Sequence, residues 1–206
     1  ALIQETLSSF GVESRLEEFS FDTFQIKKAK LTITEPYTKE YTVTGYGRCA
    51  NTAEDGLKAP FVYAENGDDI SLAQVKGKIV MVNDPVRKDM YQKLVKAGAV
   101  GFISIAGSPL DEGVDLIPRA YGLPKNLPGE EKKAAGKEAQ NYDNRIPGVS
   151  IHYKDAIELV TKGASQACLV VEQETVTRTS RNVVAQIEGT DKAEEILTLT
   201  AHYDSV

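Results

Sequence analysis

Apolar runs bounded by glycine, proline and charged residues divide this chain into short predicted elements, and the clearest group lies near its middle. Residues 77–83 form an almost continuous apolar run, which predicts a buried strand. Asp84 and Pro85 then have the residue types of a helix N-cap and a first helical position, and Gly98 is a typical helix stop. Residues 100–105 are apolar again. Strand, helix and strand predict a βαβ unit. The apolar face of the predicted helix consists of Met90, Leu94, Val95 and Ala97.

The rest of the chain is predicted to be mostly β-structure, because its apolar residues alternate with polar ones or form short runs. Predicted strands span 12–21, 30–34, 41–46, 59–64, 146–152 and 166–189, and predicted helices span 1–10 and 155–163. The short strands between 41 and 64 are typical of a compact sandwich or barrel-like unit. Together with the βαβ unit, the pattern predicts a β-rich α/β fold. The strand-to-helix turn of that unit has no GxGxxG sequence, so phosphate binding is not expected there.

The last stretch of the chain combines a strand pattern with candidate metal chemistry. Residues 196–201 are apolar and β-branched after a charged turn, which predicts a buried strand. His202 and Asp204 follow, two positions apart, so their side chains point the same way if the extended conformation continues. This arrangement suits a metal-binding histidine supported by a carboxylate. One histidine and one aspartate do not complete a metal site, so we expect the other ligands beyond Val206.

Composition and charge narrow the possible partners. The chain has 206 residues, of which 41% are hydrophobic and 26% charged, as in ordinary globular proteins, and its formal net charge is −6. This balance argues against a nucleic-acid or anionic-membrane partner, since either needs a basic surface. No apolar stretch approaches the ~20 residues of a membrane span. The first residues lack the regions of a signal peptide, and a secreted or a cytoplasmic location both stay open.

Several other polar residues have two possible interpretations. Cys49 and Cys168 are either two free or buried thiols or a single disulfide. Residues 106–146 are rich in glycine, proline and charge, and form either a solvated excursion or a flap that contacts substrate. His152 lies between a strand and a helix without ligand spacing around it, which indicates a structural or surface histidine. The polar or aromatic side chains of interest in the long loop are Arg119, Tyr121 and Arg145.

Four segments of the central region occur in a familiar order: Lys76-Gly-Lys-Ile-Val-Met-Val, a helix ending Ala97-Gly-Ala, Val100-Gly-Phe-Ile-Ser-Ile and Ile146-Pro-Gly-Val-Ser-Ile. Together they resemble the protease-associated (PA) domain, a small β-rich fold with flanking helices that is inserted in several peptidase families. Residues 180–190, a short turn and residues 196–206 are similar to the start of the catalytic domain in co-catalytic two-zinc aminopeptidases. That family includes relatives of glutamate carboxypeptidase and the bacterial leucyl-type aminopeptidases, and it carries a PA domain just ahead of this stretch.

The resemblance implies a zinc-dependent aminopeptidase that hydrolyses N-terminal peptide bonds of peptide substrates. It assigns His202 as a ligand of one zinc ion and Asp204 as the supporting carboxylate of the catalytic site. Two zinc ions in the parent protein would lower the pKa of a bridging water, a glutamate would accept its proton, and the metals would polarise the scissile carbonyl. The other ligands and the glutamate lie downstream in the family. The 206-residue chain itself is therefore expected to be inactive and to bind no zinc.

The resemblance also implies a domain organisation. Residues 1–30 and 175–206 would be incomplete parts of the catalytic domain, and 31–174 the inserted PA-like domain, which would act as a lid or substrate-access module. Strands of an incomplete domain have exposed edges, so association through them is expected. The alternative is a non-catalytic PA-domain interaction module or a receptor-like relative. Retention of both His202 and Asp204 weighs against that alternative.

Overall fold

The structure, a computed structural model, describes residues 2–83, 85–108, 110, 118–127, 142–192 and 194–203. The chain divides into two compact units, one made of residues 1–21 with 177–206 and the other of residues 22–176. No helix within the described ranges is long and apolar enough to cross a membrane.

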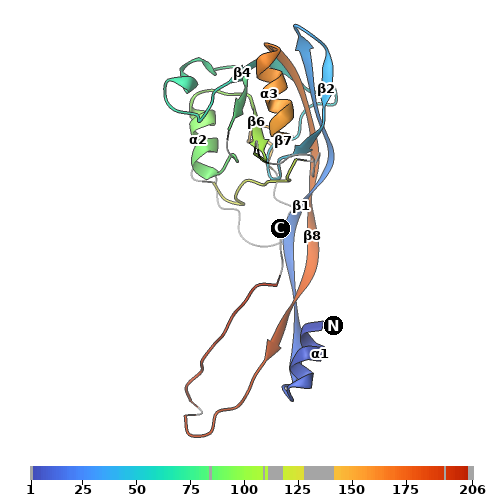
Figure 1. Ribbon diagram of the computed structural model, residues 1–206, viewed down its shortest axis with the longest axis vertical. Helices are drawn as coiled ribbons and strands as arrows, with labels where there is room; N and C mark the ends of the chain where they lie inside the picture. The colour runs from blue at the N-terminus through green and yellow to red at the C-terminus, as the bar shows by residue number, and fades with distance from the viewer. Residues whose placement is uncertain are drawn as a thin grey trace. The chain divides into compact units, whose positions relative to one another are not determined.

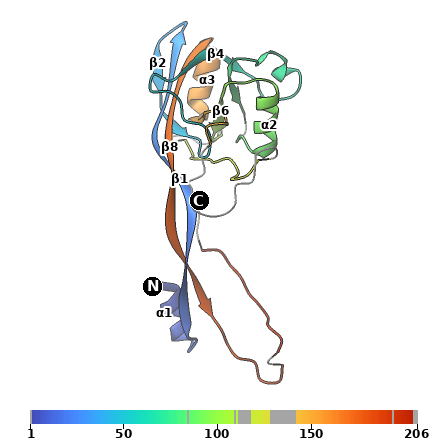
Figure 2. The same cartoon turned by 180° about the vertical axis from the view of Figure 1, so that it is seen from behind.

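One mixed sheet of eight strands is the main feature of the fold (Figure 1), and its strand order is β2-β1-β8-β4-β5-β6-β7-β3. The strands are β1 (Ser14–Glu35), β2 (Lys39–Tyr41), β3 (Val43–Gly45), β4 (Leu57–Tyr63), β5 (Ile79–Val82), β6 (Gly101–Ala106), β7 (Gly148–His152) and β8 (Gln166–Ala185). The helices are α1 (Leu2–Ser9), α2 (Lys88–Lys96) and α3 (Tyr153–Thr161), with a 3-10 turn η1 (Ser71–Gln74). Figure 2 shows α2 and α3 beside the strands from behind.

The direction of the strands confirms the predicted α/β class. Strands β4 to β7 run parallel to one another, whereas β2 pairs with β1, β8 with β4, and β3 with β7 in antiparallel fashion. The order ends at two edge strands, β2 and β3, so the described strands form an open sheet. The compact sandwich or barrel-like unit predicted from the short strands between 41 and 64 stays a prediction. Periodicity predicts that a segment is a strand, but which strands pair with it depends on contacts between residues distant in sequence.

The predicted βαβ unit is present as β5, α2 and β6, but α2 begins later than the sequence indicates. Its first residue is Lys88 and its N-cap is Arg87, not Asp84 followed by Pro85, and Asp84 lies outside the described residues. Val86 is fully buried, and its carbonyl accepts a hydrogen bond of 2.8 Å from the Tyr46 hydroxyl. This tertiary contact holds the backbone outside the helix and overrides the preference of proline for a first helical position.

The C-terminal end of α2 follows the prediction, because Gly98 has φ +83° and supplies the left-handed residue that ends a helix. Its buried face differs. Leu94 is buried as predicted, but Val95 is 45% exposed and Tyr91 is buried in its place. Residues three apart lie on one helix face, so Tyr91 and Leu94 share the buried side.

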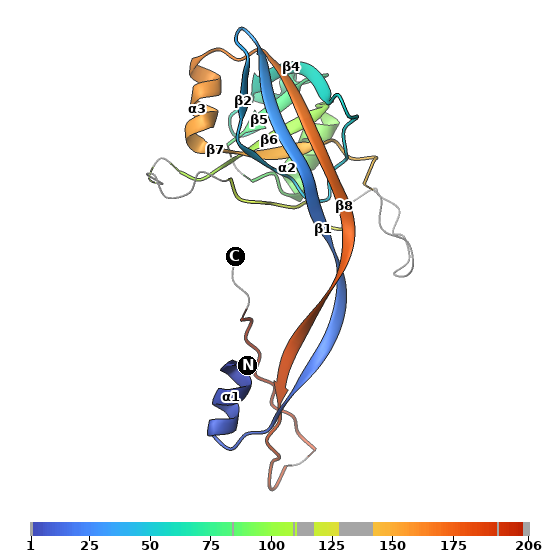
Figure 3. The same cartoon turned by 90° about the vertical axis from the view of Figure 1, so that its right-hand side faces the viewer.

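Strand β1 joins two segments that the sequence separates. The predicted strands 12–21 and 30–34 are parts of one strand of 22 residues, and β8 has 20 residues. The two are neighbours in the sheet order and run side by side in every view, most clearly in Figure 3. The stretch between the two predicted parts contains Phe24 and Ile26 among polar residues, and its pairing with β8 continues the strand through it.

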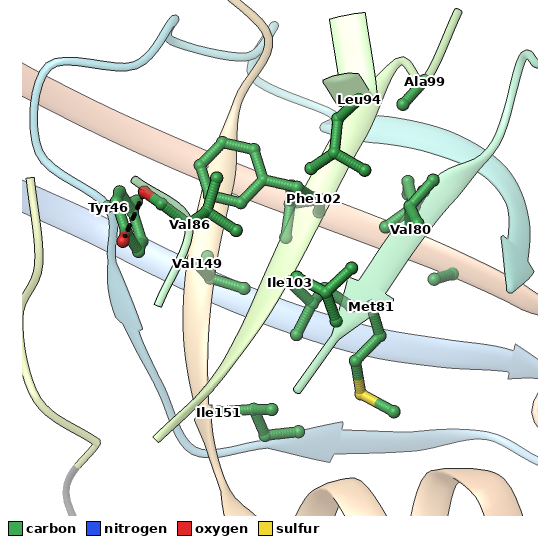
Figure 4. Packing of buried hydrophobic residues seen from close by; sticks show 14 of the residues in the cluster. Tyr46, Val80, Met81, Val86, Leu94, Ala99, Phe102, Ile103, Val149 and Ile151 are labelled. Atoms are coloured by element: carbon green, nitrogen blue, oxygen red, sulfur yellow. Dashed lines mark hydrogen bonds between the residues drawn. The ribbon is translucent and has the colours of Figure 1, made fainter. Parts of the chain in front are cut away.

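The buried apolar side chains all come from residues 31–171, within the larger unit. Phe102 on β6 lies at the centre of an aromatic group, with ring centroids 5.0 Å from Tyr46 and 6.0 Å from Tyr91. Figure 4 shows Phe102 with Val149, Ile103 and Leu94 around it, and the hydrogen bond between Tyr46 and Val86. The aromatic group fixes the approach of α2 to the sheet.

Candidate functional site

The predicted metal-binding strand is not a strand in this chain. Residues 196–203 have no regular secondary structure, and Ile196, Leu197 and Leu199 are each 89% exposed. The prediction of a buried strand over 196–201 is therefore wrong here. A strand is stable only when a neighbouring strand pairs with it and a core covers its apolar face, and neither lies against these residues.

His202, the predicted zinc ligand, lies on the surface of the smaller unit. The next residue, Tyr203, donates a hydrogen bond from its hydroxyl to the carbonyl of Arg181. Asp204, the predicted supporting carboxylate, lies outside the described residues. Within the part of the chain that the structure describes, no three His, Cys, Asp or Glu side chains come together as a metal site would require. These residues do not by themselves fit a zinc ion, which needs three or more protein ligands.

The second histidine, His152, has a structural role. It is buried at the end of β7 and is the N-cap of α3, where its Nδ1 accepts a hydrogen bond of 3.3 Å from the backbone N–H of Lys154. An N-cap acceptor satisfies one of the N–H groups that a helix leaves open at its start. His152 is therefore part of the fold, as the sequence indicated.

The two cysteines are free thiols, Cys49 buried and Cys168 partly buried, so no disulfide joins them. Burial raises the pKa of the Cys49 thiol to about 12. Its sulfur donates to the carbonyl of Tyr46 at 2.8 Å. A buried thiol with this pKa stays protonated near neutral pH, which does not suit a nucleophile.

The three side chains noted in the long loop differ in role. Arg145 is only 5% exposed and donates hydrogen bonds to backbone carbonyls, and the ring of Tyr121 stacks on that of Tyr46 with centroids 5.8 Å apart. Arg119 is exposed. Within the described part of the loop, residues 118–127 are hydrogen-bonded to the sheet region, while most of their side chains are exposed. Most of the remaining loop lies outside the described residues.

A charged group around Glu158 on α3 was not predicted. Its carboxylate accepts from Lys39 Nζ at 2.6 Å and from Lys162 Nζ at 2.7 Å. Hydrogen bonds from Lys162 and then Lys39 lower the pKa of Glu158 to about 2. The spacing of Glu158 and Lys162, four residues apart on a predicted helix, is a signal that sequence analysis could have used. Lys39 is distant in sequence and gives no such signal.

The family of the chain follows from its central residues. The PA domain matches residues 39–159, from the start of β2 into α3, which is more than half of the chain. The chain therefore belongs to the PA domain family, as its strand and helix order indicated.

Relatives of greater length resemble nearly the whole chain. Carboxypeptidase Q of Mus musculus is 22% identical over 99% of this chain and 43% of its own length. A zinc aminopeptidase from Bacillus subtilis superimposes with a TM-score of 0.60 and 20% identity over 92% of this chain and 40% of that chain. An aminopeptidase from Aneurinibacillus sp. strain AM-1 gives a TM-score of 0.59 and 18% identity over 95% of this chain and 43% of that chain. The chain thus spans less than half the length of these proteins, and at such identities the superpositions show a shared fold.

Proposed function

We propose that this chain is the front part of a zinc-dependent aminopeptidase that hydrolyses N-terminal peptide bonds. The observation that carries the proposal is the extent of the similarity. The PA domain accounts for residues 39–159, whereas the Aneurinibacillus aminopeptidase resembles 95% of the chain, so the flanking residues on both sides are included. A PA domain inserted in an unrelated protein would not share these flanks.

The proposed domain organisation assigns residues 1–30 and 175–206 to the catalytic domain and residues 31–174 to the PA domain. The PA domain would limit the access of peptide substrates, as a lid or access module. The concentration of buried apolar side chains within residues 31–171 supports a separately folded PA unit.

The proposed metal chemistry involves His202 as a ligand of one of two zinc ions and Asp204 as the carboxylate that supports it. His202 is exposed, so its ring is accessible to further ligands. The described residues lack those further ligands, so no catalytic step is assigned to them.

The full-length protein tests the proposal. It is expected to release amino acids from aminoacyl-arylamide substrates, to contain zinc, and to lose activity with a chelator. His202→Ala should lower the affinity for one zinc ion and the activity by at least tenfold, the lower end of what is lost with a mere supporting residue. His152→Gln is the matched control, since it changes the other histidine and should leave the zinc content unchanged. A full-length protein without zinc or activity would refute the proposal.

The isolated 206-residue chain provides a second test. It should hydrolyse no aminoacyl-arylamide and bind no stoichiometric zinc in a metal analysis after dialysis. Hydrolysis by this chain alone would contradict the proposal that the remaining zinc ligands lie outside these 206 residues.

A non-catalytic interaction module, or a receptor-like relative, is the second candidate function. The membership of the PA domain family fits it equally. It predicts a full-length protein that folds normally, contains no zinc and has no peptidase activity whatever the substrate, so the same measurements separate the two candidates.

Association of the isolated chain with a second copy is proposed through its exposed apolar residues. Leu197 and Leu199 are 89% exposed, and covering them removes apolar surface from water. Sedimentation should show concentration-dependent dimers that are weakened by Leu197→Lys with Leu199→Lys. Leu110→Lys is the control, because Leu110 is equally exposed elsewhere in the chain. An equal effect of both changes, or no dimer at all, would contradict this route.

A further inference from the structure

The guanidinium of Arg145 lies among backbone carbonyl oxygens. Its Nη1 donates to the carbonyl of Arg48 at 2.7 Å and to that of Pro124 at 3.0 Å, and its Nη2 donates to the carbonyl of Lys125 at 3.1 Å. The ring of Tyr142 covers one face, 4.6 Å from the guanidinium carbon. Three carbonyl dipoles thus point at one buried cation.

Two separate segments supply these carbonyls, and one of them is residues 118–127. Its first half is hydrogen-bonded to β3 and to Gly47, just beyond that strand. Thr44 Oγ1 donates to the carbonyl of Pro118 at 2.7 Å, Gly47 N–H to that of Tyr121 at 2.7 Å, and Leu123 N–H to that of Gly47 at 2.9 Å. Segment 118–127 is thereby tied to the sheet at its start and middle, and Arg145 holds its end.

The third carbonyl belongs to Arg48, which has an unusual backbone. Its φ is +58°, a left-handed conformation that costs a residue with a Cβ of order 1 kcal/mol. The conformation is held on both sides: the Arg48 N–H donates to Gln173 Oε1 at 2.8 Å, and its carbonyl accepts from Arg145. Gln173 on β8 and Arg145 together keep this turn in place.

A glycine pair lies next to the same turn and leaves room for an aromatic ring. A Cβ at Gly47 would sit 2.2 Å from Phe24 Cζ, and one at Gly122 would sit 2.8 Å from Phe24 Cε1. The Arg48 guanidinium lies 5.3 Å from the centroid of that ring. Segment 118–127 therefore also forms one wall of the slot that receives Phe24 from β1.

We propose that Arg145 acts as an internal cation that positions segment 118–127 on the sheet, in a site built for a planar guanidinium. This inference is independent of the proposed peptidase function. Without the guanidinium, these three carbonyl oxygens would lack a donor, and the free energy of folding would lose the contribution of their hydrogen bonds. A guanidinium serves several acceptors in fixed directions, whereas a lysine ammonium is a compact point charge on a flexible stem and does not reproduce the fork. The emptied site of Arg145→Ala should therefore accept a small guanidinium cation.

Amide hydrogen exchange of the 206-residue chain tests the proposal. The amides of Leu123 and Gly47 donate the hydrogen bonds that join segment 118–127 to the sheet. In Arg145→Ala these two amides should exchange about tenfold faster, which corresponds to the net free energy of about one hydrogen bond. The amides of β6 should keep their protection. Millimolar ethylguanidinium should restore the protection of Leu123 in the variant and leave the parent chain unchanged.

Two further variants make the result decisive. Arg119→Ala removes an exposed arginine of the same segment and should leave Leu123 unaffected. Arg145→Lys keeps the charge and should still expose Leu123 to exchange. Unchanged exchange at Leu123 in Arg145→Ala, full protection in Arg145→Lys, or failure of ethylguanidinium to restore it overturns the proposal. Loss of β6 protection in both Arg145 variants would also overturn it, because Arg145 would then stabilise the whole core.

Discussion

Gly148 on β7 lies directly beneath the ring of Phe102, and a Cβ at this glycine would sit 2.1 Å from Phe102 Cζ. Phe102 is fully buried, so its ring has no free space to move into. We expect Gly148→Ala to destabilise the chain by about 1–3 kcal/mol, measured by urea denaturation. The control is Gly189→Ala, where a Cβ meets no atom within 4 Å, and it should change stability by less than about 0.5 kcal/mol. Equal effects of the two changes would contradict this account of the packing.

Glu158 is the residue at which pH should act on stability. Its folded pKa of about 2 lies below the ordinary value of 4.5, so its contribution is fully present above pH 4.5 and is lost as the pH falls through about 2. Glu158→Gln should therefore lower the melting temperature at neutral pH, and the difference should shrink as the pH falls between these values. The Glu158 side chain is partly exposed and both lysines are more exposed, so the effect is small and weakens with added salt. A difference that grows at low pH would contradict the sign.

Glu40→Gln is the matched control for Glu158. Glu40 pairs with one lysine, Lys30, at 3.0 Å, whereas Glu158 joins two. The control should change the melting temperature less than Glu158→Gln at neutral pH, because an isolated surface ion pair contributes little.

At the scale of elements, helix α2 has a buried and an exposed residue next to each other in sequence. Leu94 is fully buried and Val95 is 45% exposed. Leu94→Ala should cost about 2–5 kcal/mol through lost burial and a cavity, whereas Val95→Ala should cost less than about 1 kcal/mol. Chemical denaturation of the two variants measures both. If the two variants lost similar stability, the buried face of α2 would include Val95, as the sequence predicted, and the observed burial would be contradicted.

The elements also show how far the sequence pattern reaches. Apolar runs were sufficient to predict β5, α2 and β6, because a buried parallel strand and an amphipathic helix each have a local signature. They did not predict that β1 is continuous. Its middle has only two large apolar residues, Phe24 and Ile26, among polar ones, and it pairs with β8, which lies more than 100 positions away along the chain. The start of α2 was missed for a similar reason, since the hydroxyl of Tyr46 holds Val86 outside the helix.

At the scale of the whole molecule, the boundary of the larger unit is open to a direct test. Residues 22–30 include Phe24 and Ile26, which contact Gly47 and Gly45. A protein of residues 22–176 should unfold cooperatively in urea, and one of residues 31–174 should be less stable by about 1–3 kcal/mol, because it loses the two partly buried side chains of Phe24 and Ile26. Failure of 22–176 to fold would contradict a core contained within it. Equal stability would favour the shorter boundary proposed from the sequence.

The sequence by itself determined the α/β class, the βαβ unit, the glycine that ends α2 and the resemblance to the PA domain, because these depend on residue types at short spacing. It also identified His202 and Asp204 as candidates for metal chemistry, and their roles stay a prediction. Tertiary structure alone decided that Arg145 is buried among carbonyls, that Gly148 lies under Phe102, and that residues 196–201 are exposed. Each of these depends on which distant segments meet. An arginine in a polar loop and an apolar run after a turn look the same in sequence whether or not a partner covers them.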